Sequence, residues 1–132
     1  WVGNVLGLLE TIVNAKLGND VSEFVELWDR KRMMAYLICC CQDEDGGLRD
    51  KPEMFPDFYH TCYTLSGLSA CQYIHLINDQ NVDDNGFDIS SLKIEDNDVI
   101  DQNPVNFVNC IDPIFSLPVG VAERIRKVFE EL

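Results

Sequence analysis

The chain has 132 residues, 46% of them hydrophobic, so it can form one domain with a modest core and is too apolar for wholesale disorder. Its 10 Lys and Arg and 23 Asp and Glu give a net charge of −13, which disfavours nucleic-acid binding because neutralising phosphates needs clustered basic residues. No apolar run reaches the roughly 18 residues that a membrane span requires, and no basic-then-apolar leader opens the chain.

The six cysteines do not predict a disulfide framework. Cys39, Cys40 and Cys41 are consecutive in a helix-like run, where adjacent side chains diverge and cannot pair conveniently. The chain contains no C-x-x-C pair, so a self-contained zinc knuckle is not expected. We predict small, buried, apolar cysteine side chains in a reducing cytosol.

Two helices are predicted at the start of the chain. Apolar residues recur at helical spacing between residues 2 and 17, and the pattern stops at Gly18. Asp20 or Ser22 can cap a second helix that continues to about Cys41. The short connection predicts that the two helices form an antiparallel pair.

A loop is predicted next. Gly46 and Gly47 break the helix, because glycine adopts left-handed dihedrals with little strain. Pro52 and Pro56 then keep residues 46–56 out of a helix, so we expect an ordered loop. The double glycine alone is a weak signal, since any sharp turn can use it.

The following helix carries the most informative side chains. Pro56 followed by Asp57 is a start signal, because a short carboxylate accepts hydrogen bonds from free backbone N–H groups. His60 falls one turn after Asp57, and Tyr63 falls four residues after Tyr59. We expect a helix end that presents these groups as one wall of a pocket. The alternative is a buried, hydrogen-bonded core histidine, because a lone His is weak evidence of a metal site.

This helix is predicted to run to about Ile77, with His75 as a surface or cap residue near its end. Residues 78–102 are rich in Asp and Glu against the single Lys93, which predicts a long, solvated acidic loop. A calcium loop fails there, because Leu92 stands where a bidentate Glu is needed.

The C-terminal part is predicted to be irregular and then helical. Asn103-Pro104-Val105 and Pro113 imply an extended passage. Apolar residues at helical spacing predict a final helix from Pro118, with Ser116 as a possible cap, that closes against the other helices.

Two stretches carry a family resemblance. GGLRDKP at residues 46–52 and DFYHTCYTLSGLSACQ at residues 57–72 strongly resemble the last repeat region of the protein farnesyltransferase β-subunit family. Trp1-Val2-Gly3 resembles the end of that family's DxCYSFW segment, and Asn103-Pro104-Val105-Asn106 resembles its C-terminal region.

The resemblance implies a fold and a set of partners. Residues 1–132 would be the C-terminal portion of an all-α, α/α toroid, a closed ring of helix pairs, with residues 78–102 inserted as an acidic loop. The family works in the cytoplasm as a heterodimer with an α subunit and moves farnesyl from farnesyl diphosphate to the cysteine of a C-terminal C-a-a-X sequence. Because the chain begins with Trp1 and not Met, we expect a piece of a longer polypeptide that is inactive alone.

The resemblance also implies zinc, which makes the substrate thiol a thiolate near neutral pH. His60 matches the family's histidine ligand, and the aspartate and cysteine ligands belong to the segment before Trp1. Asp57 would be a hydrogen-bonding partner behind that ligand, although N-capping explains it equally well. Asp50 matches the aspartate associated with magnesium and the diphosphate.

Three aromatic residues match substrate-binding positions. Trp1 matches a tryptophan of the isoprenoid cavity, and Tyr63 resembles an aromatic that helps set isoprenoid length. Tyr59 borders the phosphate and the peptide, so Tyr59 and His60 are the predicted catalytic residues. Glu53 to Pro56 depart from the family, which usually has basic residues there. We therefore expect this chain to differ from the family in how it binds diphosphate or in its metal requirement. A geranylgeranyltransferase β subunit and a non-catalytic helical scaffold from a truncated gene are the alternatives.

Overall fold

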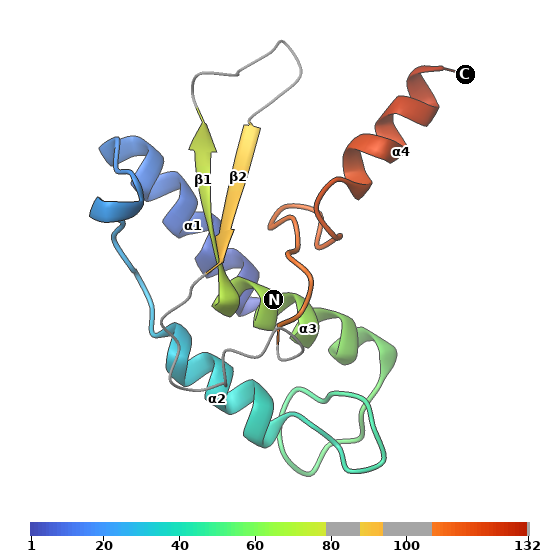
Figure 1. Cartoon of the computed structure of the whole chain (residues 1–132). Helices are drawn as coiled ribbons and strands as arrows, with labels where there is room; N and C mark the ends of the chain where they lie inside the picture. The colour runs from blue at the N-terminus through green and yellow to red at the C-terminus, as the bar shows by residue number, and fades with distance from the viewer. Residues whose placement is uncertain (79–87, 94–106, 132) are drawn as a thin grey trace.

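The computed structural model describes residues 1–78, 88–93 and 107–131, and its elements are mostly helical (Figure 1). In chain order they are α1 (Val2–Leu17), the 3-10 turn η1 (Val21–Glu23), α2 (Arg30–Cys40), α3 (Phe58–Gln72), β1 (Tyr73–Asn78), β2 (Asp88–Lys93) and α4 (Val121–Glu130). Among these described elements, no helix has both the length and the hydropathy of a membrane span. The helical prediction is confirmed, and the hairpin of β1 and β2 is the exception to it.

α1 ends where the sequence predicts. Gly18 adopts the left-handed conformation, with φ 71°, and its N–H donates to the Ala15 carbonyl at 3.2 Å. The Asn19 N–H donates to the Asn14 carbonyl at 3.0 Å. These two bonds satisfy carbonyls that the end of a helix leaves free.

α2 begins at Arg30, so the prediction of a start near Ser22 is wrong. Asp20 caps only the single turn η1, where its carboxylate accepts from the Ser22 N–H at 2.8 Å. The N-cap of α2 is Asp29, which accepts from the Arg32 N–H at 2.9 Å.

Buried side chains of α1 explain the late start. The Asn14 side chain accepts from the Val25 N–H at 2.8 Å and donates to the Val25 carbonyl at 3.1 Å. The Glu10 carboxylate accepts from the Leu27 N–H at 2.8 Å. These backbone groups are used in tertiary hydrogen bonds, so residues 24–29 do not continue a helix.

α3 begins at the predicted Asp57 signal but ends at Gln72, so the predicted end near Ile77 is wrong. The chain continues directly into β1, which pairs antiparallel with β2, with Tyr73 opposite Lys93. Aromatic and β-branched residues such as Tyr73 and Ile77 favour a strand when a partner strand is available.

His75 lies on β1 and is only 3% exposed, so its assignment as a surface or cap residue is also wrong. Burial, and to a smaller extent the positive charge of Arg30, lower its pKa to about 4, against an opposing effect of Asp112. The ring is therefore neutral at physiological pH.

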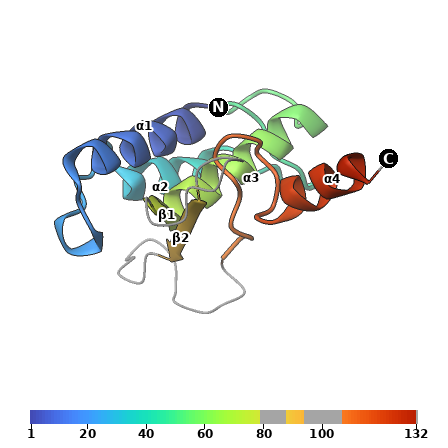
Figure 2. The same cartoon turned by 90° about the horizontal axis from the view of Figure 1, so that it is seen from above.

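α1 and α3 run parallel, side by side, as both views show (Figures 1 and 2). Gly3 meets Gly67, and Gly7 meets Ala70, so the contacting residues ascend together on the two helices. Small residues at these four positions allow the backbones to approach closely.

α2 covers another side of α3 and runs antiparallel to it. Met34, near the start of α2, lies against Gln72 at the end of α3. Leu37, one turn later on α2, contacts Gly67, which lies earlier on α3. α1 and α2 thus run in opposite directions, as predicted, but each of them packs on α3.

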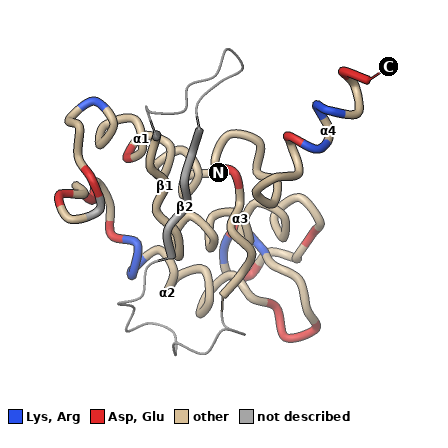
Figure 3. Tube along the Cα trace, turned by 45° about the horizontal axis from the view of Figure 1, so that its top comes forward, with Lys and Arg blue, Asp and Glu red and all other residues tan. Residues whose placement is uncertain are grey.

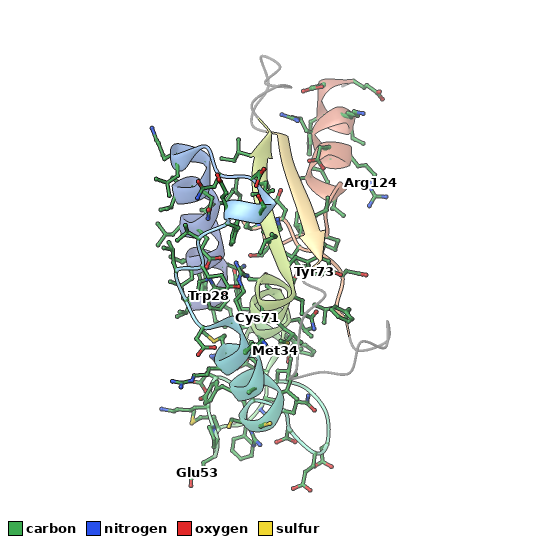
Figure 4. The ribbon with its side chains drawn as sticks, turned by 60° about the vertical axis from the view of Figure 1, so that its left-hand side comes forward. Trp28, Met34, Glu53, Cys71, Tyr73 and Arg124 are labelled. Carbon is green, nitrogen blue, oxygen red and sulfur yellow. The ribbon has the colours of Figure 1, made fainter. Side chains whose placement is uncertain are left out.

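The centre of the fold contains a buried ion pair. Arg30 pairs with Glu10, and its guanidinium also donates to the carbonyls of Ala70 and Tyr73. The Trp28 ring lies 4.8 Å from the guanidinium carbon. Burial lowers the pKa of Arg30 to about 10, so the guanidinium remains charged at neutral pH. Figure 4 labels the neighbouring side chains Trp28, Met34, Cys71 and Tyr73.

Residues 107–119 form the predicted irregular passage, and polar side chains of α3 hold it in place. The Gln72 side chain accepts from the Val108 N–H at 3.0 Å. The Ser69 hydroxyl accepts from the Ile111 N–H, also at 3.0 Å. Because these residues are one turn apart on α3, they form a polar stripe that faces the passage.

The N-cap of α4 is Gly120 and not Ser116. None of the residues of α4 is buried, so the prediction that it closes against the other helices is wrong for this chain. Its apolar residues Ile125, Val128 and Phe129 are exposed, and Figure 3 shows Lys and Arg along the same helix.

Much of the predicted acidic loop, 78–102, lies outside the described residues. Asn103-Pro104-Val105-Asn106 and the first part of the rejected calcium loop lie outside them too. Its described part, β2, is paired with β1, so the loop prediction is wrong there.

The six cysteines form no disulfide within the described part of the chain, which contains all of them. Cys41 and Cys71 are buried, but Cys39 and Cys62 are exposed, so the prediction of uniform burial is wrong.

Candidate functional site

Three aromatic residues from two helices form a cluster, called here the aromatic cluster: Trp1, Tyr59 and Tyr63. The Trp1 ring stacks on Tyr63 with 4.3 Å between centroids and 21° between planes. Tyr59 lies 4.9 Å from Tyr63, and the Trp1 indole N–H donates to the Tyr59 hydroxyl. Residues 58 positions apart in sequence therefore meet, because the first turn of α1 lies against the middle of α3.

The aromatic cluster keeps a face open to a ligand. Trp1 and Tyr59 are more than half exposed even though their rings contact one another. Exposed aromatic surface that is already ordered by stacking is suited to an apolar ligand, because little freedom is lost on binding.

Asp57 holds an imidazole, that of His60, beside this cluster. Its Oδ1 accepts from the His60 N–H at 2.7 Å, which makes it the N-cap of α3. Its Oδ2 lies 2.7 Å from His60 Nδ1. The backbone hydrogen bond, and then the ring hydrogen bond, lower the pKa of Asp57, so the carboxylate is ionised at neutral pH. The N-cap explanation of Asp57 is confirmed, and its role behind a zinc ligand stays a prediction.

An ionised Asp57 favours the tautomer of His60 that carries its proton on Nδ1. That proton is donated to the carboxylate, and the lone pair of Nε2 is left on the opposite side of the ring. A histidine held in this way has the arrangement found behind most metal-ligating histidines. His60 and Asp57 therefore fit one position of a metal site.

The environment of His60 differs from that of a core histidine. Its side chain is 36% exposed, and its ring meets the Tyr59 ring edge-on at 5.3 Å. The alternative of a buried core histidine is therefore wrong for this chain. Within the described part of the chain, no group of three or more His, Cys, Asp and Glu side chains could hold a metal ion.

The glycine loop is fixed beside this end of α3. Gly46 and Gly47 have φ values of 98° and 86°, as their predicted role requires. The Leu48 N–H donates to the Thr61 hydroxyl at 2.9 Å, which ties the turn to the residue after His60. The loop prediction is thus confirmed here.

Asp50 lies in this loop with an exposed side chain. Its backbone carbonyl accepts from the Tyr36 hydroxyl at 3.2 Å and from the Cys41 thiol at 3.8 Å. Those hydrogen bonds fix the backbone at Asp50. The described contacts of the His60 ring are to Asp57 and Tyr59, and the Asp50 carboxylate is not among them.

Sequence reasoning missed three polar residues that hold this region together: Asn4, Thr61 and Ser66. The Asn4 side chain donates to the Ser66 hydroxyl at 2.7 Å, one helical turn from the aromatic cluster. An asparagine within an apolar helix, one turn after Trp1, was the available signal, because buried polar side chains need partners.

The comparisons with known proteins agree with this arrangement. The family model of the prenyltransferase alpha-alpha toroid domain matches residues 1–117. The farnesyltransferase β subunit of Pyricularia oryzae is 32% identical over 98% of this chain and 25% of its own length. That of Pisum sativum is 58% identical over 42% of this chain and 14% of its own length. A probable geranylgeranyl transferase type-2 β subunit of Dictyostelium discoideum is 41% identical over 30% of this chain and 12% of its own length.

The chain spans about a quarter of the length of the curated relative that it matches from end to end. The matched family and the glycine loop agree with the fold and the relationship predicted from the sequence. The chain belongs to the prenyltransferase alpha-alpha toroid domain family.

Proposed function

We propose that this chain is part of a zinc-dependent protein farnesyltransferase β subunit. The observation that carries the proposal is the aromatic cluster lying directly beside the His60–Asp57 pair. An apolar ring surface suits an isoprenoid chain, and an oriented imidazole suits a metal that activates a thiol. The two requirements of prenyl transfer thus meet at one end of α3.

In the proposed reaction, the bond between C1 of farnesyl and the diphosphate oxygen breaks, and a bond from C1 to the cysteine sulfur of a C-a-a-X peptide forms. The diphosphate leaves, and the thiol proton passes to solvent. Zinc, when bound, would lower the pKa of the substrate thiol so that sulfur is a nucleophile at neutral pH. In this chain His60 Nε2 would supply one ligand, and two more would come from parts of the longer polypeptide outside this chain.

The chain's own residues would bind and orient the reactants. Trp1 and Tyr63 would hold the isoprenoid by ring contacts, and Tyr59 would border the reacting phosphate side and the peptide. Asp57 would keep the His60 ring in one tautomer and one orientation. The exposed carboxylate of Asp50 is proposed as a magnesium ligand near the diphosphate, because magnesium prefers oxygen ligands.

The proposal includes an α subunit as partner and a cytoplasmic location. The six free thiols support a reducing compartment. Farnesyl is preferred as the transferred group because the relatives from Pyricularia oryzae and Pisum sativum are named farnesyltransferase subunits. Geranylgeranyl is the second candidate, since one relative bears the name of a geranylgeranyl transferase.

The test uses the full-length polypeptide that contains this sequence, purified with its partner subunit. We expect transfer of farnesyl to a C-a-a-X peptide, and preference for farnesyl over geranylgeranyl diphosphate when the donors compete. The His60→Ala variant should lose zinc and activity together. Normal zinc content in that variant would remove His60 from the site, and absence of transfer by the unaltered protein would refute the proposed function.

The same assay on the 132-residue chain should show no turnover and weak zinc binding at most. Only one of three ligands is proposed to lie in this chain, and a single histidine does not hold zinc tightly. Robust turnover by the chain alone would contradict this expectation.

A further inference from the structure

The contact of α1 with α3 below the aromatic cluster is unusually close. A Cβ added to Gly3 would lie 3.1 Å from Gly67 Cα and 3.2 Å from the Gly67 carbonyl oxygen. The backbones themselves are therefore in contact, so the separation of the helices at this level has little room to change.

One polar side chain ties the same level together. Asn4 is 8% exposed and uses both of its amide hydrogens, one toward the Ser66 hydroxyl and one toward the Ser116 hydroxyl, each at 2.7 Å. Ser66 belongs to α3, and Ser116 belongs to the passage before α4. Three segments that are distant in sequence are thus joined at one amide.

This junction lies one helical turn from the aromatic rings on both helices. Asn4 follows Trp1 by three residues on α1, and Ser66 follows Tyr63 by three residues on α3. The stacked ring pair and the Asn4–Ser66 hydrogen bond are therefore neighbouring levels of the same helix contact.

The third partner of the junction is also constrained. Ser116 has φ 55°, a left-handed conformation that costs a non-glycine residue strain, and it persists where surrounding contacts impose it. Asp112 supplies one such contact, since its carbonyl accepts from the Ser116 N–H at 2.9 Å. The hydrogen bond from Asn4 therefore reaches a turn that is already fixed, and it anchors α1 to it.

We propose that Asn4 is a positioning residue that sets which isoprenoid length the site accepts. By fixing the first turn of α1 against α3 and against Ser116, it holds the Trp1 ring at a fixed place over Tyr63. A ring surface that cannot recede discriminates against a longer chain, whereas a surface with a void below it can move to admit one. The inference rests on the proposed function, because it concerns the donor of that reaction.

Asn4→Ala in the full-length protein with its partner subunit tests the inference, with Asn14→Ala as the matched control. Both asparagines are buried on α1 and both lose hydrogen bonds, but Asn14 bonds the segment at Val25, far along the helix. The ratio of kcat/KM for farnesyl to that for geranylgeranyl diphosphate should fall about fivefold or more in Asn4→Ala. It should stay unchanged in Asn14→Ala, although both variants lose thermal stability.

Equal donor ratios in the two variants would overturn the inference. If Asn4→Ala does not fold, Ser116→Ala removes one of the two acceptors and should shift the ratio in the same direction by a smaller factor; an unchanged ratio there would overturn it as well. If the unaltered protein transfers neither donor, the proposed function fails. The near-ultraviolet circular dichroism of the Trp1–Tyr63 stack then decides the positioning role, which is refuted if Asn4→Ala and Asn14→Ala give the same signal.

Discussion

The Glu10–Arg30 pair predicts a large loss of stability when only one partner is removed. Arg30→Met leaves the buried Glu10 carboxylate without its cationic partner, which costs about 3–5 kcal/mol in folded proteins. The carbonyls of Ala70 and Tyr73 also lose a donor, at about 1 kcal/mol each. Because the stability of a whole domain is about 5–15 kcal/mol, this combined loss of about 5–7 kcal/mol removes a third of it or more.

Urea titration followed by far-ultraviolet circular dichroism measures this loss. Adding Glu10→Gln to Arg30→Met removes the unpaired charge and keeps an oxygen for the Leu27 N–H, so the double variant should be about 1–3 kcal/mol more stable than Arg30→Met alone. Arg32→Met, which breaks the exposed pair with Asp29, should cost less than about 1 kcal/mol. Equal losses for Arg30→Met and Arg32→Met, or a double variant less stable than the single one, would refute the argument.

Three further predictions follow from single contacts. Asp57→Asn keeps an N-cap oxygen but cannot accept a hydrogen bond from His60 Nδ1. The zinc affinity of the full-length protein, measured by competition with a chelator, should therefore fall about 10–100-fold with little change in helix content. Unchanged affinity would contradict the role of this hydrogen bond. The depressed pKa of His75 means that, as pH falls, the unfolded chain binds a proton at this ring before the folded chain does. Up to about 3 kcal/mol of stability should therefore be present above pH 6.5 and lost as pH falls toward 4. In unfolding measured against pH, His75→Gln should flatten this slope, and an accessible ring would give no slope. Gly47→Ala and Gly18→Ala each place a Cβ on a left-handed residue, which costs about 1–2 kcal/mol of stability. Of the two, only the new Cβ at Gly47 would lie 3.0 Å from a neighbour, Pro56 Cβ, so Gly47→Ala should lower the melting temperature more. Equal shifts in melting temperature would argue against that contact.

The features that the sequence predicts correctly are those with local causes. The end of α1 depends on Gly18, and the start of α3 depends on Asp57, a carboxylate that caps the residues just after it. The pairing of Asp57 with His60 and the neighbouring rings of Tyr59 and Tyr63 follow from spacings of three and four on one helix.

The features that the sequence predicts wrongly are decided by residues far away in the chain. The start of α2 is delayed because Glu10 and Asn14 on α1 take backbone groups of the connecting segment. The end of α3 is set where Arg30 binds carbonyls and where β2 offers a partner strand. His75 lies on the strand that follows α3 and is buried. No sequence pattern within a few residues of His75 could indicate that burial.

α1 shows how a correct periodicity can conceal which face is buried. Its spacing predicts the helix, yet the residues it buries are small or polar: Gly3, Asn4, Gly7, Glu10, Thr11 and Asn14. Its large apolar residues Val2, Val5, Leu9 and Ile12 are exposed in this chain. A contiguous apolar face of this kind is typical of a surface that meets further protein. The chain spans about a quarter of the Pyricularia oryzae relative, and we propose that the apolar face packs against other parts of a longer polypeptide. The polar face makes the contacts that place Trp1 beside Tyr59 and Tyr63.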